Sequence, residues 1–164
     1  MKSILTLDYA QMAPRVFYGL AGATPPEGDA YIIPGYEWHR EGVKKVFNAL
    51  LFTDRPLERF PLGTRKLFPD RASVGEVVLL LAEKHRPIAH LFCTNIGFRD
   101  MFIESEILVD VLLQLLDRGI TALPVHDAVI VARSKAPMAK EVMLSVFQAH
   151  TGVSGAVEEE LMEG

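Results

Sequence analysis

Residues 120–132 read Ile-Thr-Ala-Leu-Pro-Val-His-Asp-Ala-Val-Ile-Val-Ala, which is two β-prone runs separated only by His126 and Asp127. A two-residue connection between such runs is typical of a tight hairpin with both connecting residues at its tip. The stretch therefore predicts two antiparallel strands, and it places the carboxylate of Asp127 at one end of a sheet.

A second apolar run lies near the start of the chain, where residues 3–7 lead into Asp8. Because the strands of one sheet place their ends close together, we expect Asp8 and Asp127 to converge although 119 positions separate them. Two such carboxylates could hold two Mg²⁺ ions, with Mn²⁺ as a substitute, roughly 3.5–4 Å apart as phosphoryl transfer requires. The two aspartates are therefore the predicted catalytic and metal-binding residues.

Apolar residues recur at helical spacing in several further segments. The predicted helices cover residues 36–52, 74–85, 103–118 and 136–150, with a shorter helix after Pro14 and an edge strand over residues 154–160. In the first of these helices Arg40, Lys44 and Asn48 recur every four residues, so they share one helix face that could hold a triphosphate.

Together these elements predict an α+β fold in a single domain spanning residues 1–164, with helices packed on one side of a small antiparallel sheet. Residues 36–102 are expected to form a helical, basic insertion. Residues 40–99 hold 11 basic and 6 acidic residues, whereas the rest of the chain holds 6 basic and 15 acidic residues. A phosphate-binding middle flanked by metal-binding carboxylates would give this asymmetry, and so would ordinary solvated surfaces.

The sequence carries no signal for a membrane or for export. No apolar run reaches the ~18 residues of a membrane helix, and the first residues lack the apolar stretch of a signal peptide. The single cysteine, Cys93, cannot form an internal disulfide. We expect a cytoplasmic protein with no membrane partner.

Three separated segments resemble motifs A, B and C of the family A DNA polymerases and of the related single-subunit phage-type RNA polymerases. Residues 8–16, Asp-Tyr-Ala-Gln-Met-Ala-Pro-Arg-Val, are similar to the motif A sequence DYSQIELRV. The positions that match it are Asp8, Tyr9, Gln11, Arg15 and Val16. The resemblance implies that Asp8 is the first metal ligand and that Gln11 and Arg15 contact nucleic acid.

The motif B pattern, Arg-x3-Lys-x3-Phe-x3-Tyr, resembles the spacing of Arg40, Lys44, Asn48 and Phe52. Arg40 and Lys44 match the pattern, and the other two residues are substitutions. The resemblance implies that these four residues bind the incoming nucleoside triphosphate, with the two basic side chains on its phosphates and Phe52 near the template base.

Residues 123–129, Leu-Pro-Val-His-Asp-Ala-Val, look like the motif C sequence LQVHDEV. The resemblance implies that Asp127 is the second metal ligand and that His126 lies beside the primer end. Carried over to this chain, the three motifs imply a palm-like sheet with a fingers-like helical insertion. They also imply template-directed nucleotidyl transfer on a nucleic acid primer-template, with nucleoside triphosphates as substrates.

The chain departs from these motifs at several points. Ala13 stands where the DNA polymerases have the glutamate that excludes a 2′-hydroxyl, so we expect poor discrimination between ribonucleotides and deoxyribonucleotides. Ala128 replaces the acidic residue that often follows the catalytic aspartate. Only seven residues precede Asp8, where family members carry a thumb, so we expect a second chain or a second copy to supply that element.

Two other functions suit the same residues. A metal-dependent nuclease would use the same carboxylate pair, and a polymerase-derived replication accessory protein would bind nucleic acid without catalysis. Glu104 and Glu106, near the start of the helix predicted at residues 103–118, are interpreted as first-turn charges stabilised by the helix dipole.

Overall fold

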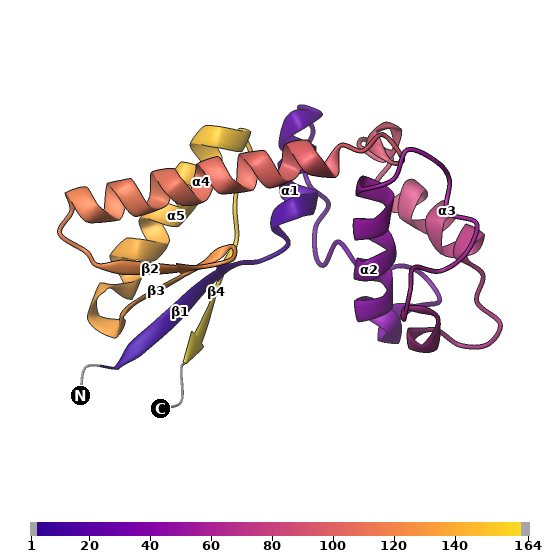
Figure 1. The fold of residues 1–164 in the computed structure, drawn as a ribbon, viewed down its shortest axis with the longest axis horizontal. Coiled ribbons are helices and arrows are strands. Elements are labelled where there is room, and N and C mark those ends of the chain that lie inside the picture. The colour runs from indigo at the N-terminus through magenta and orange to yellow at the C-terminus, as the bar shows by residue number, and fades with distance from the viewer. Residues whose placement is uncertain (1–2, 162–164) are drawn as a thin grey trace. The chain divides into compact units, whose positions relative to one another are not determined.

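The strands of the chain form one antiparallel sheet in a computed structural model, which describes residues 3–161. They are β1 (Ile4–Tyr9), β2 (Ala122–Val125), β3 (Ala128–Ala132) and β4 (Val157–Leu161), and their order across the sheet is β2-β3-β1-β4 (Figure 1). The β2–β3 hairpin thus lies beside the first strand, whose other edge is covered by the last strand. The predicted α+β fold with a small antiparallel sheet is confirmed.

Helices and short turns connect these strands. The helices are α1 (Met12–Leu20), α2 (Arg40–Leu51), α3 (Val74–Lys84), α4 (Gly97–Asp117) and α5 (Ala136–Thr151). The described residues also form the 3-10 turns η1 (Glu37–His39), η2 (Arg65–Leu67), η3 (Ala89–Leu91) and η4 (Arg133–Lys135). No helix within residues 3–161 is both long and apolar enough to cross a membrane.

Helix α4 begins six residues before the predicted start at position 103. Asn95, just before it, has a positive φ of 56°, which ends the preceding turn and allows a new helix to start at Gly97. The acidic residue in the first turn is Asp100. The interpretation of Glu104 and Glu106 as first-turn charges is therefore wrong, because both lie further inside the helix.

The chain divides into two compact units. Unit 1 consists of Met1–Thr24 with Asp100–Gly164, and it contains the sheet, α1, α5 and most of α4. Unit 2 is Pro25–Arg99 and contains α2 and α3.

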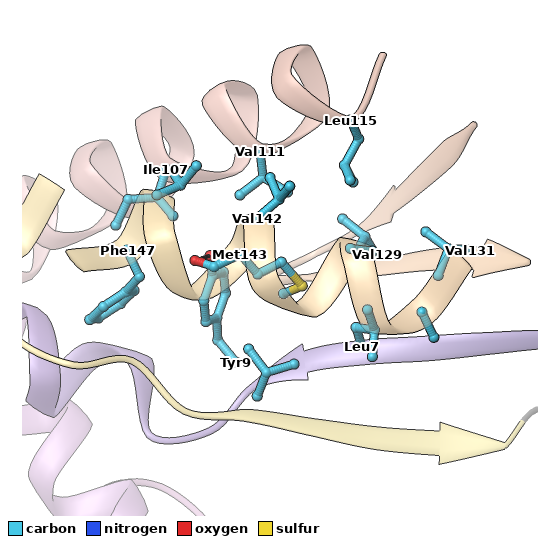
Figure 2. Close-up of a cluster of buried hydrophobic side chains, with 14 of the residues drawn as sticks. Leu7, Tyr9, Ile107, Val111, Leu115, Val129, Val131, Val142, Met143 and Phe147 are labelled. Atoms are coloured by element: carbon cyan, nitrogen blue, oxygen red, sulfur yellow. Dashed lines mark hydrogen bonds between the residues drawn. The ribbon is translucent and has the colours of Figure 1, made fainter. Parts of the chain in front are cut away.

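The core of unit 1 lies between one face of the sheet and the helices α4 and α5 (Figure 1). Alternate residues of β1, Leu5, Leu7 and Tyr9, are buried, as a strand with one covered face requires. Figure 2 shows the side chains of these strands meeting those of the two helices. The labelled core residues are Leu7, Tyr9, Val129 and Val131 from the strands, Ile107, Val111 and Leu115 from α4, and Val142, Met143 and Phe147 from α5.

The core of unit 2 is built on the apolar face of α2, which contacts α3. The apolar residues of the helix predicted at residues 36–52 recur at helical spacing and are all buried: Val43, Val46, Phe47, Leu50 and Leu51. On α3, Val77 and Leu81 are fully buried, and His85, the residue that follows that helix, is buried with its ring against Phe47. The helical periodicity of the sequence therefore identified the buried side of α2 correctly.

Candidate functional site

Asp8 and Asp127 lie at the same end of the sheet. In the β1–β3 ladder Asp8 is directly opposite Ala128, the residue that follows Asp127. Opposite residues in an antiparallel pair have Cα atoms about 4.5–5.5 Å apart and successive Cα atoms are about 3.8 Å apart, so the Cα atoms of the two aspartates are at most about 9 Å apart. Because Leu7 and Tyr9 face the core, Asp8 faces the side of the sheet away from α4 and α5.

A residue close to each aspartate in the sequence has an unusual backbone conformation. His126, at the hairpin tip, has φ 53°, and Gln11, the N-cap of α1, has φ 54° and ψ 44°. These values lie in the left-handed region, which is uncommon for residues other than glycine. Such conformations concentrate at functional sites, where the surrounding structure maintains them. His126 directly precedes Asp127, and Gln11 lies three residues after Asp8.

A hollow of about 420 Å³ adjoins Asp127 within unit 1. It is lined by Met101, Glu104, Ser105, Leu108, His126 and Asp127. Glu104 therefore shares this hollow with one predicted metal ligand, which the sequence analysis did not anticipate.

The pKa values of the Glu104 and Asp100 carboxyls are both raised above their ordinary values. Burial, and then the negative charge of Asp127, raise the pKa of Glu104 to about 7. Burial, and then the charge of Glu104, raise the pKa of Asp100 to about 8. Asp100 Oδ1 is buried and has no hydrogen-bond partner among the described residues. The sequence contains a pattern that could have predicted this burial. Asp100 and Glu104 are four residues apart and in helical register with the buried Ile107 and Val111, which places both acids toward the core side of α4.

A further carboxylate stands beside Asp8. Glu158 on β4 is directly opposite Asp8 in the β1–β4 ladder and is exposed, so both side chains project from the same face of the sheet. Within residues 3–161 no three His, Cys, Asp or Glu side chains converge closely enough to form a complete metal site. Mg²⁺ needs no such cage, since one or two carboxylates with water and substrate phosphates usually hold it. The oxygen donors of Asp8 and Asp127 fit that pattern.

Arg15 is anchored within unit 1. Its Nη1 donates a hydrogen bond of 2.8 Å to the carbonyl oxygen of Ser154, in the segment that leads into β4. This contact ties α1 to the strand beside Asp8. The contact of Arg15 and Gln11 with nucleic acid stays a prediction.

In unit 2, Arg40 and Lys44 lie over one aromatic ring. The Arg40 Cζ atom is 5.3 Å and the Lys44 Nζ atom 6.0 Å from the ring centre of Tyr31, which is buried. Arg40 Nε also donates to Asp29 Oδ2 at 2.6 Å, and the other oxygen of Asp29 accepts the backbone N–H of Tyr31 at 2.8 Å. The two cations thus share one face of α2, as their four-residue spacing predicts.

The other two predicted nucleotide-binding residues differ in their surroundings. Asn48 is half-buried on α2. Phe52, which follows α2, packs its ring edge-on against Phe98 with centroids 5.6 Å apart, and a Cβ atom at Gly97 would lie within 2.8 Å of the Phe52 ring. The side of Phe52 that faces Gly97 and Phe98 is therefore occupied by protein.

The fold is similar to that of a DNA polymerase. No family model and no curated protein sequence matches the chain. Among solved structures, the chain is similar to the POL domain of Pol1 from M. smegmatis, determined in complex with DNA primer-template and dNTP, with a TM-score of 0.58 and 12% sequence identity. The match covers 96% of this chain and 39% of that one, so the chain spans less than half of the polymerase structure it resembles. At this identity the likeness establishes a polymerase-like α+β fold.

Proposed function

We propose that this protein is a family A-like nucleotidyltransferase that extends a primer along a nucleic acid template and uses two divalent metal ions. The observation that carries the proposal is the pairing of Asp8 with Ala128, which brings the carboxylates of Asp8 and Asp127 to one end of a polymerase-like sheet. In this proposal, unit 1 corresponds to a palm and the helical segment of residues 36–102 to fingers.

The two aspartates would hold Mg²⁺, and the bound ions would supply charge stabilisation for the attacking 3′-oxygen and the leaving pyrophosphate. The protein's part is positioning. The β1–β3 ladder fixes the backbone spacing of Asp8 and Asp127, and the left-handed His126 fixes the direction in which the chain turns at Asp127. Glu158, opposite Asp8, adds negative charge to the same face in place of the acidic residue that Ala128 replaces.

The proposal assigns the triphosphate to the α2 face of Arg40 and Lys44. Both side chains are exposed, and both are oriented by the buried ring of Tyr31. Asp29 neutralises Arg40 in the absence of an anion, so a triphosphate would compete with Asp29 for the guanidinium. Asn48 and Phe52 complete the proposed nucleotide contacts of this face. In unit 1, Ala13 stands at the position where the resemblance to the DNA polymerases expects the glutamate that excludes a 2′-hydroxyl.

The proposed partners are a nucleic acid primer-template and nucleoside triphosphates. The polymerase structure in the comparison holds DNA primer-template and dNTP, which supports this choice. A thumb-like element from a second chain or a second copy is part of the proposal, because it would grip the duplex.

The test is a labelled primer-template incubated with nucleoside triphosphates and Mg²⁺. The proposal expects the primer to lengthen in a template-dependent manner, and Asp127→Asn should reduce the rate by at least about a thousandfold, since loss of a metal ligand removes several kcal/mol of charge stabilisation. Asp117→Asn is the matched control, because Asp117 is an exposed aspartate at the end of α4 outside the site.

Each other outcome identifies a different function. Shortening of the primer that depends on Asp127 would indicate a nuclease, and retention of an unchanged primer would indicate a nucleic-acid-binding protein without catalysis. Extension that survives Asp127→Asn would contradict the proposed role of the carboxylate pair.

A further inference from the structure

Trp38 is the single tryptophan of the chain, and it lies in η1 of unit 2 with 94% of its surface exposed. An indole is a large, mostly apolar group, and leaving it in water forgoes the stabilisation that burial would give. Tryptophan is also the residue type most enriched among the energetically dominant residues of binding surfaces.

The residues on both sides of Trp38 are fixed. The buried Tyr36 donates its hydroxyl hydrogen to Glu76 Oε2 at 2.7 Å. His39 Nδ1 is 2.9 Å from the carbonyl oxygen of Leu67, to which it donates, and the His39 ring stacks on Phe68 at 6.1 Å. Trp38 is therefore exposed on an anchored turn. A rigid aromatic side chain loses little conformational entropy on binding, which suits a stacking contact.

The turn beside Trp38 is basic. Since His39 contacts Leu67 and Phe68, η1 lies next to η2, which carries the exposed Arg65 and Lys66. Residues 55–71 around η2 hold five basic and two acidic residues. The nearest acid in η1, Glu37, accepts a hydrogen bond from the backbone N–H of Gly35 at 2.9 Å.

Arg65 and Lys66 also border a hollow of about 440 Å³. Its lining residues are Gly63, Arg65, Lys66, Phe68 and Asp70. Arg65 is held there by hydrogen bonds to the carbonyl oxygens of Pro69 and Asp70, and its guanidinium lies 5.4 Å above the Phe60 ring. Arg65 and Lys66 therefore lie on a turn that is held by hydrogen bonds, as Trp38 does.

We propose that the surface formed by Trp38, Arg65 and Lys66 binds a single-stranded segment of nucleic acid. The indole stacks on a base, and the basic side chains contact neighbouring phosphates, which is the combination that single-strand binding uses. Lysine is depleted at protein–protein interfaces, so the basic rim favours nucleic acid over an apolar protein partner. The inference rests on the proposed function, because a template-directed enzyme must hold an unpaired template strand.

The test uses the intrinsic fluorescence of the protein, which reports on Trp38 alone because the chain has one tryptophan. Addition of a short oligothymidylate at low salt should quench the emission, because the base covers the indole. Trp38→Ala should weaken binding of a labelled oligothymidylate at least about fivefold, the equivalent of ~1 kcal/mol for one stacked base. Trp38→Phe should retain part of the affinity, and Lys66→Gln should reduce the salt dependence of binding.

Phe102→Ala is the matched control, since Phe102 is an exposed aromatic residue on α4 in unit 1, and its removal should leave the affinity unchanged. Unchanged emission on binding, wild-type affinity of Trp38→Ala, or no binding of any oligonucleotide would overturn the inference. Binding that depends on Trp38 without primer extension would refute the proposed activity and leave the inference standing. Primer extension with an unchanged KM for primer-template in Trp38→Ala would refute the inference alone.

Discussion

Asp100→Asn should remove a loss of stability that the wild type undergoes between acidic and neutral pH. The free energy of unfolding of the variant, relative to that of the wild type, should therefore rise with pH. Asp100 is 3% exposed on α4, and its Oδ1 atom has no hydrogen-bond partner among the described residues. Its pKa is raised from 3.8 to about 8, first by burial and then by the negative charge of Glu104. The folded protein therefore holds a proton at Asp100 that the unfolded chain releases.

The magnitude follows from proton linkage. Between pH 3.8 and about 8 the folded state binds one proton more than the unfolded state at this residue, so the free energy of unfolding falls as pH rises. At about 1.36 kcal/mol per pH unit, the loss between pH 4 and pH 7 is roughly 3–4 kcal/mol. Asparagine does not ionise, so the variant lacks this loss, although its new amide group adds a roughly constant penalty of about 1–3 kcal/mol if it stays unpaired.

The assay is urea unfolding of the wild type and Asp100→Asn at several pH values between about 4 and 8. The stability difference between the two proteins should change in favour of the variant by roughly 3 kcal/mol as pH rises, whatever its value at pH 4. Asp117→Asn, which removes an exposed carboxyl from the same helix, is the matched control. A difference for Asp100→Asn that is constant across this range would refute the reasoning.

Three further predictions concern other parts of the chain. Gly42→Ala should destabilise the protein by about 1–2 kcal/mol, because the new Cβ would lie 2.7 Å from the buried Phe68 ring, and overpacking of this kind outweighs the gain of up to about 1 kcal/mol in helix propensity. Gly75→Ala in α3 should instead be neutral or stabilising, since the space around its Cβ position is open apart from its chain neighbours and the backbone of its own helix. Equal effects of the two substitutions in thermal unfolding would contradict the packing argument. Burial lowers the pKa of His85 below its ordinary value of 6.5, so the folded protein favours the neutral ring and loses stability as pH falls below that value. His85→Gln should therefore lose less stability than the wild type between about pH 7 and 5.5. An equally steep loss in the variant would contradict this reasoning. If the protein extends primers, Ala13→Glu should raise its preference for deoxyribonucleotides at least about tenfold in competing incorporation, the effect of about 1.4 kcal/mol, and an unchanged ratio would count against the role of Ala13.

The local elements were accessible from the sequence because each depends on contiguous residues. The run of apolar residues up to Asp8, the hairpin with His126 and Asp127 at its tip, and the apolar stripe of α2 all appear in the structure where periodicity predicts them. The convergence of the two aspartates also followed, since strand ends in one sheet lie close together. Their catalytic roles stay predictions.

The tertiary structure alone decided the neighbours of these residues. The sheet order β2-β3-β1-β4 sets Ala128 on one side of Asp8 and Glu158 on the other, and this choice of partner strands depends on residues more than a hundred positions apart. The earlier start of α4 and its packing on the sheet turn Glu104 from a presumed first-turn charge into a half-buried acid beside Asp127. Local periodicity shows which side chains share a helix face, but the charge state and partners of those side chains depend on which other segments cover that face.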